Sequence, residues 1–186
     1  MTGRLRRAGR LLDTLALFGL SGALLVAFYY QFARGELPCP LCALQRVGFI
    51  VAGVALVLNL RVGRSPAHYG IVLLTSIAAA SASLRQIALH VVPGTGSYGS
   101  ALLGMHFYTW AFVAYVALVA CVALGLLLGA DPVPDADAAP PDRLARAACR
   151  LFLVVAAANV VSFLLECGLG PCPDDPVGYL WLPGTR

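Results

Sequence analysis

Long apolar runs separated by short polar segments make up most of this chain of 186 residues. Each run is close to the ~20 residues that a helix needs to cross a bilayer. The runs are rich in Leu, Ala and Val and do not alternate with a period of two residues, which predicts helices rather than strands. The sequence therefore predicts an all-α membrane protein, one integral membrane domain over residues 1–186, with helices at about 11–33, 43–61, 69–91, 107–129 and 147–166.

The composition excludes an ordinary soluble domain. Hydrophobic residues make up 60% of the chain and charged residues only 12%, against about 25% charged residues in soluble proteins. The formal net charge is +4, but the basic residues form no patch with interleaved aromatic residues, so nucleic-acid binding is not indicated. The first apolar run is longer than the core of a signal peptide, about 7–15 residues, and no convincing cleavage site follows, which favours a retained first span.

Basic residues predict the orientation of the five spans. With five crossings, the regions before the first span, between the second and third, and before the fifth lie on one face. Positive residues mark the cytoplasmic face, so the N-terminus and a linker at about 130–146 are predicted to be cytoplasmic. The tail, residues 167–186, is then periplasmic, in a bacterial inner membrane. The basic residues that carry this prediction are Arg4, Arg6, Arg7, Arg10, Arg61, Arg64, Arg143, Arg146 and Arg150.

The six cysteines divide into two close pairs and two single residues. Cys39 and Cys42 lie between the first two spans, and a second pair follows the fifth span, so both pairs are predicted to face the periplasm. Disulfides form and persist in that compartment. Cys121 and Cys149 fall in the cytoplasmic half, where we expect them to be buried as small apolar residues.

The segment Cys39-Pro-Leu-Cys42 is a CxxC motif at a helix–helix corner. Pro38 and Pro40 keep the entry non-helical, because proline lacks the amide donor and disfavours helix in the preceding residue. If helix resumes near Leu41, the thiols lie at a helix N-terminus, where the macrodipole lowers thiol pKa values. The pattern favours a redox-active dithiol; a structural bridge and a metal site remain alternatives, since four outward cysteines match a zinc ligand count.

The second pair, Cys167 and Cys172, is separated by four residues and surrounded by Gly and Pro, which suits a small disulfide loop. Glu166, Asp174 and Asp175 are close in sequence, and negative neighbours disfavour thiolate, so this pair should be less acidic than the first. Two interpretations stay open. The pair is a structural staple of the tail, or it exchanges disulfides with a soluble partner and then with the CxxC pair.

Three polar residues are candidates for cofactor binding. Arg46 follows Cys42 by four residues, one helical turn away; it either stabilises a Cys42 thiolate, bonds a quinone carbonyl, or extends to the headgroups. Arg85, inside the third span, poses the same alternatives, and His90 at its outer end is either a proton relay or a polar anchor. The aromatic residues around Trp110 indicate an interfacial belt, with the wall of a ring-binding site as the alternative.

The segment Leu37-Pro-Cys-Pro-Leu-Cys-Ala-Leu-Gln-Arg46 resembles the first periplasmic loop of the disulfide bond formation protein B (DsbB) family, whose pattern is a CxxC followed four residues later by arginine. The region of Arg85 and His90 and the start of the fourth span are also similar, so that the likeness covers about residues 11–129. It implies a DsbB-like four-helix bundle, here with one additional C-terminal helix. It also implies a thiol:quinone oxidoreductase that reoxidises a periplasmic DsbA-like thioredoxin-fold protein and passes the electrons to ubiquinone or menaquinone.

By this resemblance, Cys39 and Cys42 would be the quinone-coupled pair, with Cys42 beside the ring and Arg46 in contact with it. The chain departs from the family in one respect: the loop between the third and fourth spans, which carries the family's second cysteine pair, has no cysteine here. We expect Cys167 and Cys172 to take over that role. The alternatives are a quinone reductase like vitamin K epoxide reductase, and a non-enzymatic membrane protein that binds metal or supports assembly.

Overall fold

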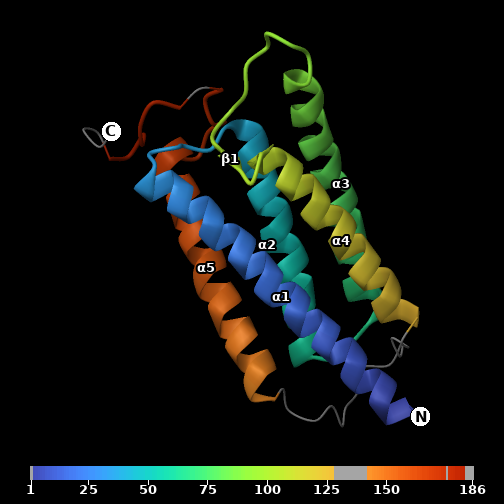
Figure 1. The fold of residues 1–186 in the computed structure, drawn as a ribbon. Helices are drawn as coiled ribbons and strands as arrows, with labels where there is room; N and C mark the ends of the chain where they lie inside the picture. Colours follow the sequence, from blue (N-terminus) through green and yellow to red (C-terminus); the bar gives the residue numbers. More distant parts are fainter. Residues whose placement is uncertain (1, 128–141, 175, 183–186) are drawn as a thin grey trace.

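The computed structural model describes residues 2–127, 142–174 and 176–182. Five long helices run side by side in a bundle (Figure 1). Within the described residues, all five are long and apolar enough to cross a membrane. The predicted all-α membrane bundle is confirmed. The helices are α1 (Thr2–Ala33), α2 (Pro40–Arg61), α3 (Pro66–His90), α4 (Phe107–Leu127) and α5 (Arg143–Cys167).

Two helices begin earlier than the apolar runs predicted, because polar residues next to these runs extend the helix. The first helix begins at Thr2, because the polar N-terminal segment contains arginines, which favour helix. The fifth begins at Arg143, within the predicted linker, because the Asp142 side chain accepts a hydrogen bond of 2.8 Å from the amide of Ala145 and caps the helix. The rest of that linker, residues 130–141, lies outside the described residues.

The two ends of the bundle carry different residues. The start of α1, the α2–α3 connection and the start of α5 lie at one end, and the Cys39–Cys42 segment and the C-terminal tail lie at the other (Figure 1). The three arginine-containing regions therefore share one end. At that end Arg64 pairs with Asp13 at 3.5 Å, and the Tyr69 hydroxyl donates to the same carboxylate at 2.8 Å. These contacts join α1 to α3 at the end of the bundle opposite to the CxxC pair and the tail disulfide.

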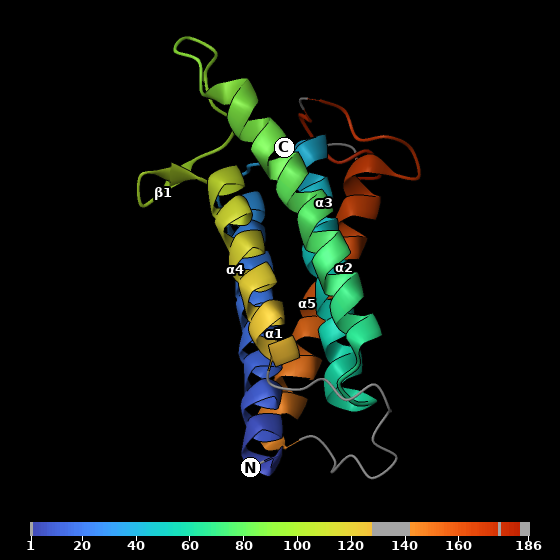
Figure 2. The same ribbon diagram turned by 90° about the vertical axis from the view of Figure 1, so that its right-hand side faces the viewer.

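A short hairpin precedes α4. Its strands, β1 (Ala101–Leu102) and β2 (Met105–His106), pair in antiparallel fashion, and Figure 2 shows β1 beside the start of α4. The turn residues Leu103 and Gly104 both have positive φ, 52° and 81°, as tight two-residue hairpin turns require. Trp110 Nε1 donates to the Leu102 carbonyl at 2.9 Å, which fixes the hairpin to α4.

The additional helix α5 is an integral part of the bundle. It lies along α1 in Figure 1 and also packs against α2. Its fully buried Phe152 presses its ring against Gly53 of α2, so closely that a β-carbon at Gly53 would overlap the ring. The lack of a side chain at this position therefore allows α2 and α5 to approach.

Gly53→Ala should destabilise the bundle, because the new methyl group would overlap a buried ring with no free space to move into. Overpacking of this kind costs about 1–3 kcal/mol, which should lower the midpoint of thermal unfolding in detergent by several degrees. Gly70→Ala is the matched control, since nothing lies within 4 Å of a β-carbon at Gly70. Equal midpoints for the two variants would contradict the close α2–α5 packing.

Candidate functional site

The CxxC motif starts α2. Cys39 is the N-cap residue, with extended backbone angles of φ −68° and ψ 166°, and Pro40 occupies the first turn, where its missing amide hydrogen is not needed. The Sγ atoms of Cys39 and Cys42 lie 2.6 Å apart, and the Cys42 amide donates to the Cys39 sulfur at 3.3 Å. Both residues are free thiols in this structure. The helix start thus holds the two sulfurs close enough for disulfide closure.

The position of Cys39 makes it the acidic thiol of the pair. Its pKa is lowered from 9.0 to about 7, first of all by the hydrogen bond from the Cys42 side chain; burial opposes this, while the backbone amides of Cys42 and Leu41 support it. Those amides are the unpaired donors of the helix N-terminus. This lowered pKa favours the thiolate form of Cys39, which is the form that attacks disulfides.

A buried glutamine on α3 contacts both sulfurs. The Gln86 amide donates to Cys39 at 3.4 Å and to Cys42 at 3.6 Å, and its carbonyl accepts from Gln45 at 2.9 Å. Gln86 is 1% exposed. Gln86 is not among the residues that the sequence pattern predicted for the site; its neighbour Arg85 is. The sequence does contain a pattern that indicates Gln86: Ala79, Ser83 and Gln86 follow one another at helical spacing, and all three lie on the buried face of α3.

The structure does not bring Arg85 or His90 into the cysteine site. Arg85 is exposed, since it lies one residue away from the buried stripe and so points away from the bundle. His90 is half-buried and stacks on Tyr108 with ring centroids 5.6 Å apart. It therefore supports one wall of the cavity described next from behind rather than lining it.

Cys42 faces an apolar cavity of about 290 Å³ between α1, α2 and α4. Most of the wall is aliphatic or aromatic, and Arg46 and Gln45 supply polar groups. The rings of Tyr30 and Phe107 meet edge to face with centroids 4.4 Å apart. An apolar cavity with a few fixed donors suits a flat, mainly apolar ligand that carries carbonyl oxygens. The aromatic residues that line it are Tyr30, Phe49, Tyr98, Phe107, Tyr108 and Trp110.

Arg46 is buried between the cavity and α1. Its side chain is 8% exposed, and its guanidinium donates to the Gln31 carbonyl at 2.6 Å and to the Ala27 backbone carbonyl at 3.3 Å. It also lies over the ring of Phe163, 5.6 Å from the centroid. This burial argues against a side chain that extends to the lipid headgroups. The charge is held beside Cys42 instead.

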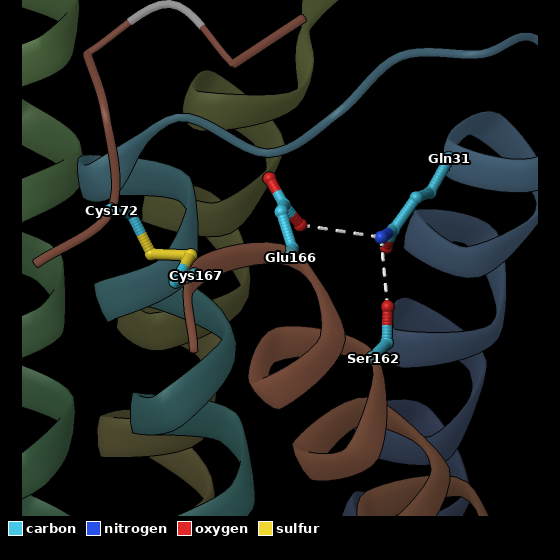
Figure 3. Close-up of a disulfide and its surroundings, with 5 residues drawn as sticks. All are labelled: Gln31, Ser162, Glu166, Cys167 and Cys172. Carbon is cyan, nitrogen blue, oxygen red and sulfur yellow. Dashed lines mark hydrogen bonds between the residues drawn. A yellow bond between two sulfur atoms is a disulfide. The ribbon is translucent and has the colours of Figure 1, made fainter. Parts of the chain in front are cut away.

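The tail pair forms a disulfide at the end of α5. Figure 3 shows the Cys167–Cys172 bond next to Glu166. The tail folds back over this helix end, because the amides of Leu180 and Trp181 donate to the carbonyls of Glu166 and Leu165 at 3.2 and 3.0 Å. Asp175 lies outside the described residues. The disulfide therefore sits in a structured turn at the same end of the bundle as the CxxC pair.

The two remaining cysteines lie apart from this site. Cys149 is fully buried in the core and Cys121 is half-buried on α4. Within the described part of the chain, no group of three or more His, Cys, Asp or Glu side chains is arranged to hold a metal ion.

Comparison with known proteins shows which family the N-terminal half of the chain resembles. The family model for disulfide bond formation protein DsbB matches residues 9–98, which include the CxxC motif and Arg46. This N-terminal half of the chain is therefore similar to the DsbB family. The match covers α1, α2 and α3, whereas α4, α5 and the tail disulfide lie beyond it. The five apolar helices of the described residues indicate a multi-pass membrane protein.

Several curated relatives carry the name "Disulfide bond formation protein B". One from Cupriavidus necator is 36% identical over 88 residues, 47% of this chain and 53% of the relative. One from Chromobacterium violaceum is 39% identical over 39% of this chain and 46% of its own length. One from Marinobacter nauticus is 41% identical over 86 residues, which are 41% of this chain and 51% of the relative. The chain thus spans about half the length of these DsbB relatives, and no solved structure matches it significantly.

Proposed function

We propose that this protein is a membrane thiol:quinone oxidoreductase that reoxidises a periplasmic DsbA-like thioredoxin-fold protein and passes the electrons to ubiquinone or menaquinone. One observation carries the proposal: Cys42 lies 2.6 Å from Cys39 and lines, together with Arg46, an apolar cavity. The names of the curated relatives support a role in disulfide bond formation.

The cavity residues fit a quinone head group. The aromatic side chains of Phe49, Tyr108 and Trp110 offer flat apolar surface, and the buried Arg46 guanidinium is a donor for a carbonyl oxygen. When bound, a quinone supplies an acceptor for two electrons and two protons. Arg85, being exposed, is not part of the proposed set, and His90 contributes by holding Tyr108.

The cysteines would act in sequence. A thiolate of the reduced partner attacks the Cys167–Cys172 disulfide and forms a mixed disulfide, and one tail sulfur leaves as thiolate. Resolution by the partner's second thiol completes its disulfide and leaves the tail pair reduced. A tail thiolate then attacks Cys39 of the oxidised CxxC pair, which releases Cys42 as a thiolate facing the cavity. The second tail thiol displaces Cys39 from this mixed disulfide, so that the tail disulfide re-forms and Cys39 and Cys42 are left reduced. Arg46 stabilises that negative charge, and two electrons and two protons leave for the acceptor as the Cys39–Cys42 disulfide re-forms.

The direct test is anaerobic mixing of the purified chain with a quinone and a reduced thioredoxin-fold oxidase. We expect the ultraviolet absorbance of the oxidised quinone to fall while the partner gains one disulfide per quinone reduced. Absence of quinone reduction with demonstrably active components would overturn the proposal. Net reduction of protein disulfides by hydroquinone would instead favour the reverse, reductase direction, and stoichiometric bound metal without quinone would favour a metal-binding role.

The double variant Cys167→Ser/Cys172→Ser tests whether the tail disulfide exchanges with the partner or only stabilises the tail. We expect partner-driven quinone reduction to fall to the background rate, while reduction driven by dithiothreitol, which reaches Cys39–Cys42 directly, is retained. Partner oxidation at the normal rate would exclude a relay through the tail. Cys121→Ser, which removes a half-buried thiol of α4 outside the cavity lining, should retain both activities and controls for the loss of a cysteine as such.

A further inference from the structure

A buried polar cluster connects α5 with the cavity. The Gln31 carbonyl accepts from Arg46 at 2.6 Å, and the Gln31 amide donates to Ser162 at 2.8 Å, to the Tyr179 hydroxyl at 3.1 Å and to Glu166 at 3.4 Å. Figure 3 shows the Gln31 side chain of α1 pointing at Ser162 and Glu166. Three helices and the tail thus meet at one amide, which lies between a cation and a carboxyl group.

Glu166 is the unexplained member of this cluster. It is 2% exposed, and one of its two carboxyl oxygens has no hydrogen-bond partner among the described residues. The other oxygen has only the long bond from Gln31. Burying an ionised carboxylate destabilises the folded protein unless a nearby positive charge or hydrogen-bond donors stabilise it. Compensation is available from Arg46, which interacts electrostatically with Glu166 although the Gln31 amide separates the two groups.

The same guanidinium acts on the thiols. Arg46 interacts electrostatically with Cys42 most strongly, then with Glu166, and more weakly with Tyr179 and Cys39. Its positive charge therefore acts both on a sulfur that becomes anionic during turnover and on the Glu166 carboxyl group, which is negative when ionised. In a region of low dielectric, an ionised carboxylate at Glu166 offsets part of the stabilisation that Arg46 gives to a Cys42 thiolate, by its own repulsion of the thiolate and by its hold on the Gln31–Arg46 pair.

We propose that Glu166 is a positioning and charge-balancing residue for Arg46: it holds the Gln31–Arg46 pair in place and sets how strongly Arg46 stabilises a thiolate at Cys42. The consequence for catalysis rests on the proposed function. Glu166 lies on α5, beyond the part of the chain that the family model matches. The additional helix would then contribute to the dithiol site as well as carrying the tail disulfide.

The test uses the variant Glu166→Gln, which retains an acceptor for Gln31 and the side-chain shape but removes the charge. Cys42 is studied as a single thiol of the site in the full-length Cys39→Ser background, with the tail disulfide intact. The rate of its alkylation by iodoacetamide is measured between pH 6 and 10 by mass spectrometry of the Cys42 peptide. Glu166→Gln should shift the profile to lower pH by about half to one unit, which is roughly three- to tenfold faster alkylation below the midpoint.

The other ionisable groups near the thiol do not explain such a shift. Tyr179 stays neutral over most of this range, because burial raises its pKa above the ordinary value. Glu36 also lines the cavity, and its carboxylate accepts a hydrogen bond from the Ser100 amide at 2.9 Å. The substitution Glu166→Gln does not alter this contact. Asp174→Asn, which removes an exposed carboxylate of the tail, is the matched control and should leave the profile in place.

A double-mutant cycle tests whether Glu166 acts through Arg46. In the presence of Arg46→Gln, adding Glu166→Gln should produce a clearly smaller shift than in the parent, because only the direct repulsion between carboxylate and thiolate is then removed. If Glu166→Gln does not fold, Glu166→Asp, which draws the carboxylate back by one methylene, should produce a smaller shift in the same direction. An unchanged profile for a folded Glu166→Gln, a shift to higher pH, or an equal shift without Arg46 would overturn the proposal.

Alkylation needs neither quinone nor partner, so the two proposals can fail separately. A shifted profile in a protein that reduces no quinone would retain the role of Glu166 and exclude the oxidoreductase function. Normal quinone reduction with an unshifted alkylation profile would support the oxidoreductase function and exclude the role of Glu166.

Discussion

Cys42→Ser is expected to reduce quinone reduction to the rate of the protein-free mixture, with either the thioredoxin-fold partner or dithiothreitol as electron donor. A serine hydroxyl forms no disulfide with Cys39 and is not ionised near neutral pH, so neither the exchange step nor a thiolate facing the cavity remains. The measurement is the anaerobic decrease in quinone absorbance. Because Cys42 lines the cavity and Cys39 does not, Cys39→Ser should also abolish turnover but leave the cavity thiol available for alkylation.

Residual turnover by Cys42→Ser above a few per cent of the parent rate would contradict the assignment. The control is Cys149→Ser, since Cys149 is a free thiol of the core at the start of α5. It should reduce stability more than activity, because it introduces a hydroxyl into an apolar environment. A loss of turnover equal to that of Cys42→Ser, in a folded protein, would show that the effect does not depend on the CxxC pair.

The parts of the fold that depend on local sequence could be predicted. The apolar runs located all five helices, because length and hydropathy dominate the choice of structure in a bilayer. Pro38 and Pro40 predicted that helix resumes close to the CxxC motif, but α2 begins at Pro40, which was expected to belong to the non-helical entry, and Cys39 is its N-cap. Helix ends such as Arg143 were misplaced by several residues, because a capping side chain such as Asp142 extends a helix beyond its apolar part.

The parts of the site that depend on tertiary contact could not be predicted in the same way. Gln86 reaches the sulfurs only because α3 presents one face to α2, and its exposed neighbour Arg85 looked more informative as a charge inside an apolar run. Glu166 was considered only as a neighbour of Cys167, since nothing in the sequence places it near Gln31. Contacts across 131 and 135 residues, such as those of Gln31 with Ser162 and Glu166, arise from packing alone.

The arrangement gives α5 two connections with the CxxC site. Its C-terminal end carries the tail disulfide, and the residue immediately before Cys167 belongs to the Gln31–Arg46 cluster. Movement of the tail during disulfide exchange would therefore act on the Tyr179 hydroxyl, which accepts from the same Gln31 amide. A fifth helix that merely added membrane anchorage would not need such polar contacts in its buried face.

Arg46→Gln should give the second largest effect, a fall in kcat for quinone reduction of about 10²- to 10³-fold, the range found when a preorganised donor to a developing anion is removed. Glutamine is also polar but uncharged, so a Cys42 thiolate would lose its nearest cation. The loss should appear mainly in kcat, because the apolar wall of the cavity still binds the ring. Steady-state kinetics with a water-soluble quinone at varied concentration would separate kcat from KM.

Arg46→Lys adds a test of geometry. It retains the charge but not the two-pronged contact with Gln31 and Ala27, and lysine does not replace arginine at such sites, so its kcat should fall between those of the parent and Arg46→Gln. Arg150→Gln, which removes an exposed arginine from the other end of α5, should leave kcat unchanged. If Arg46→Gln changed only KM, the guanidinium would serve to bind the quinone, and the thiolate would have to be stabilised by the helix N-terminus and the Gln86 amide alone.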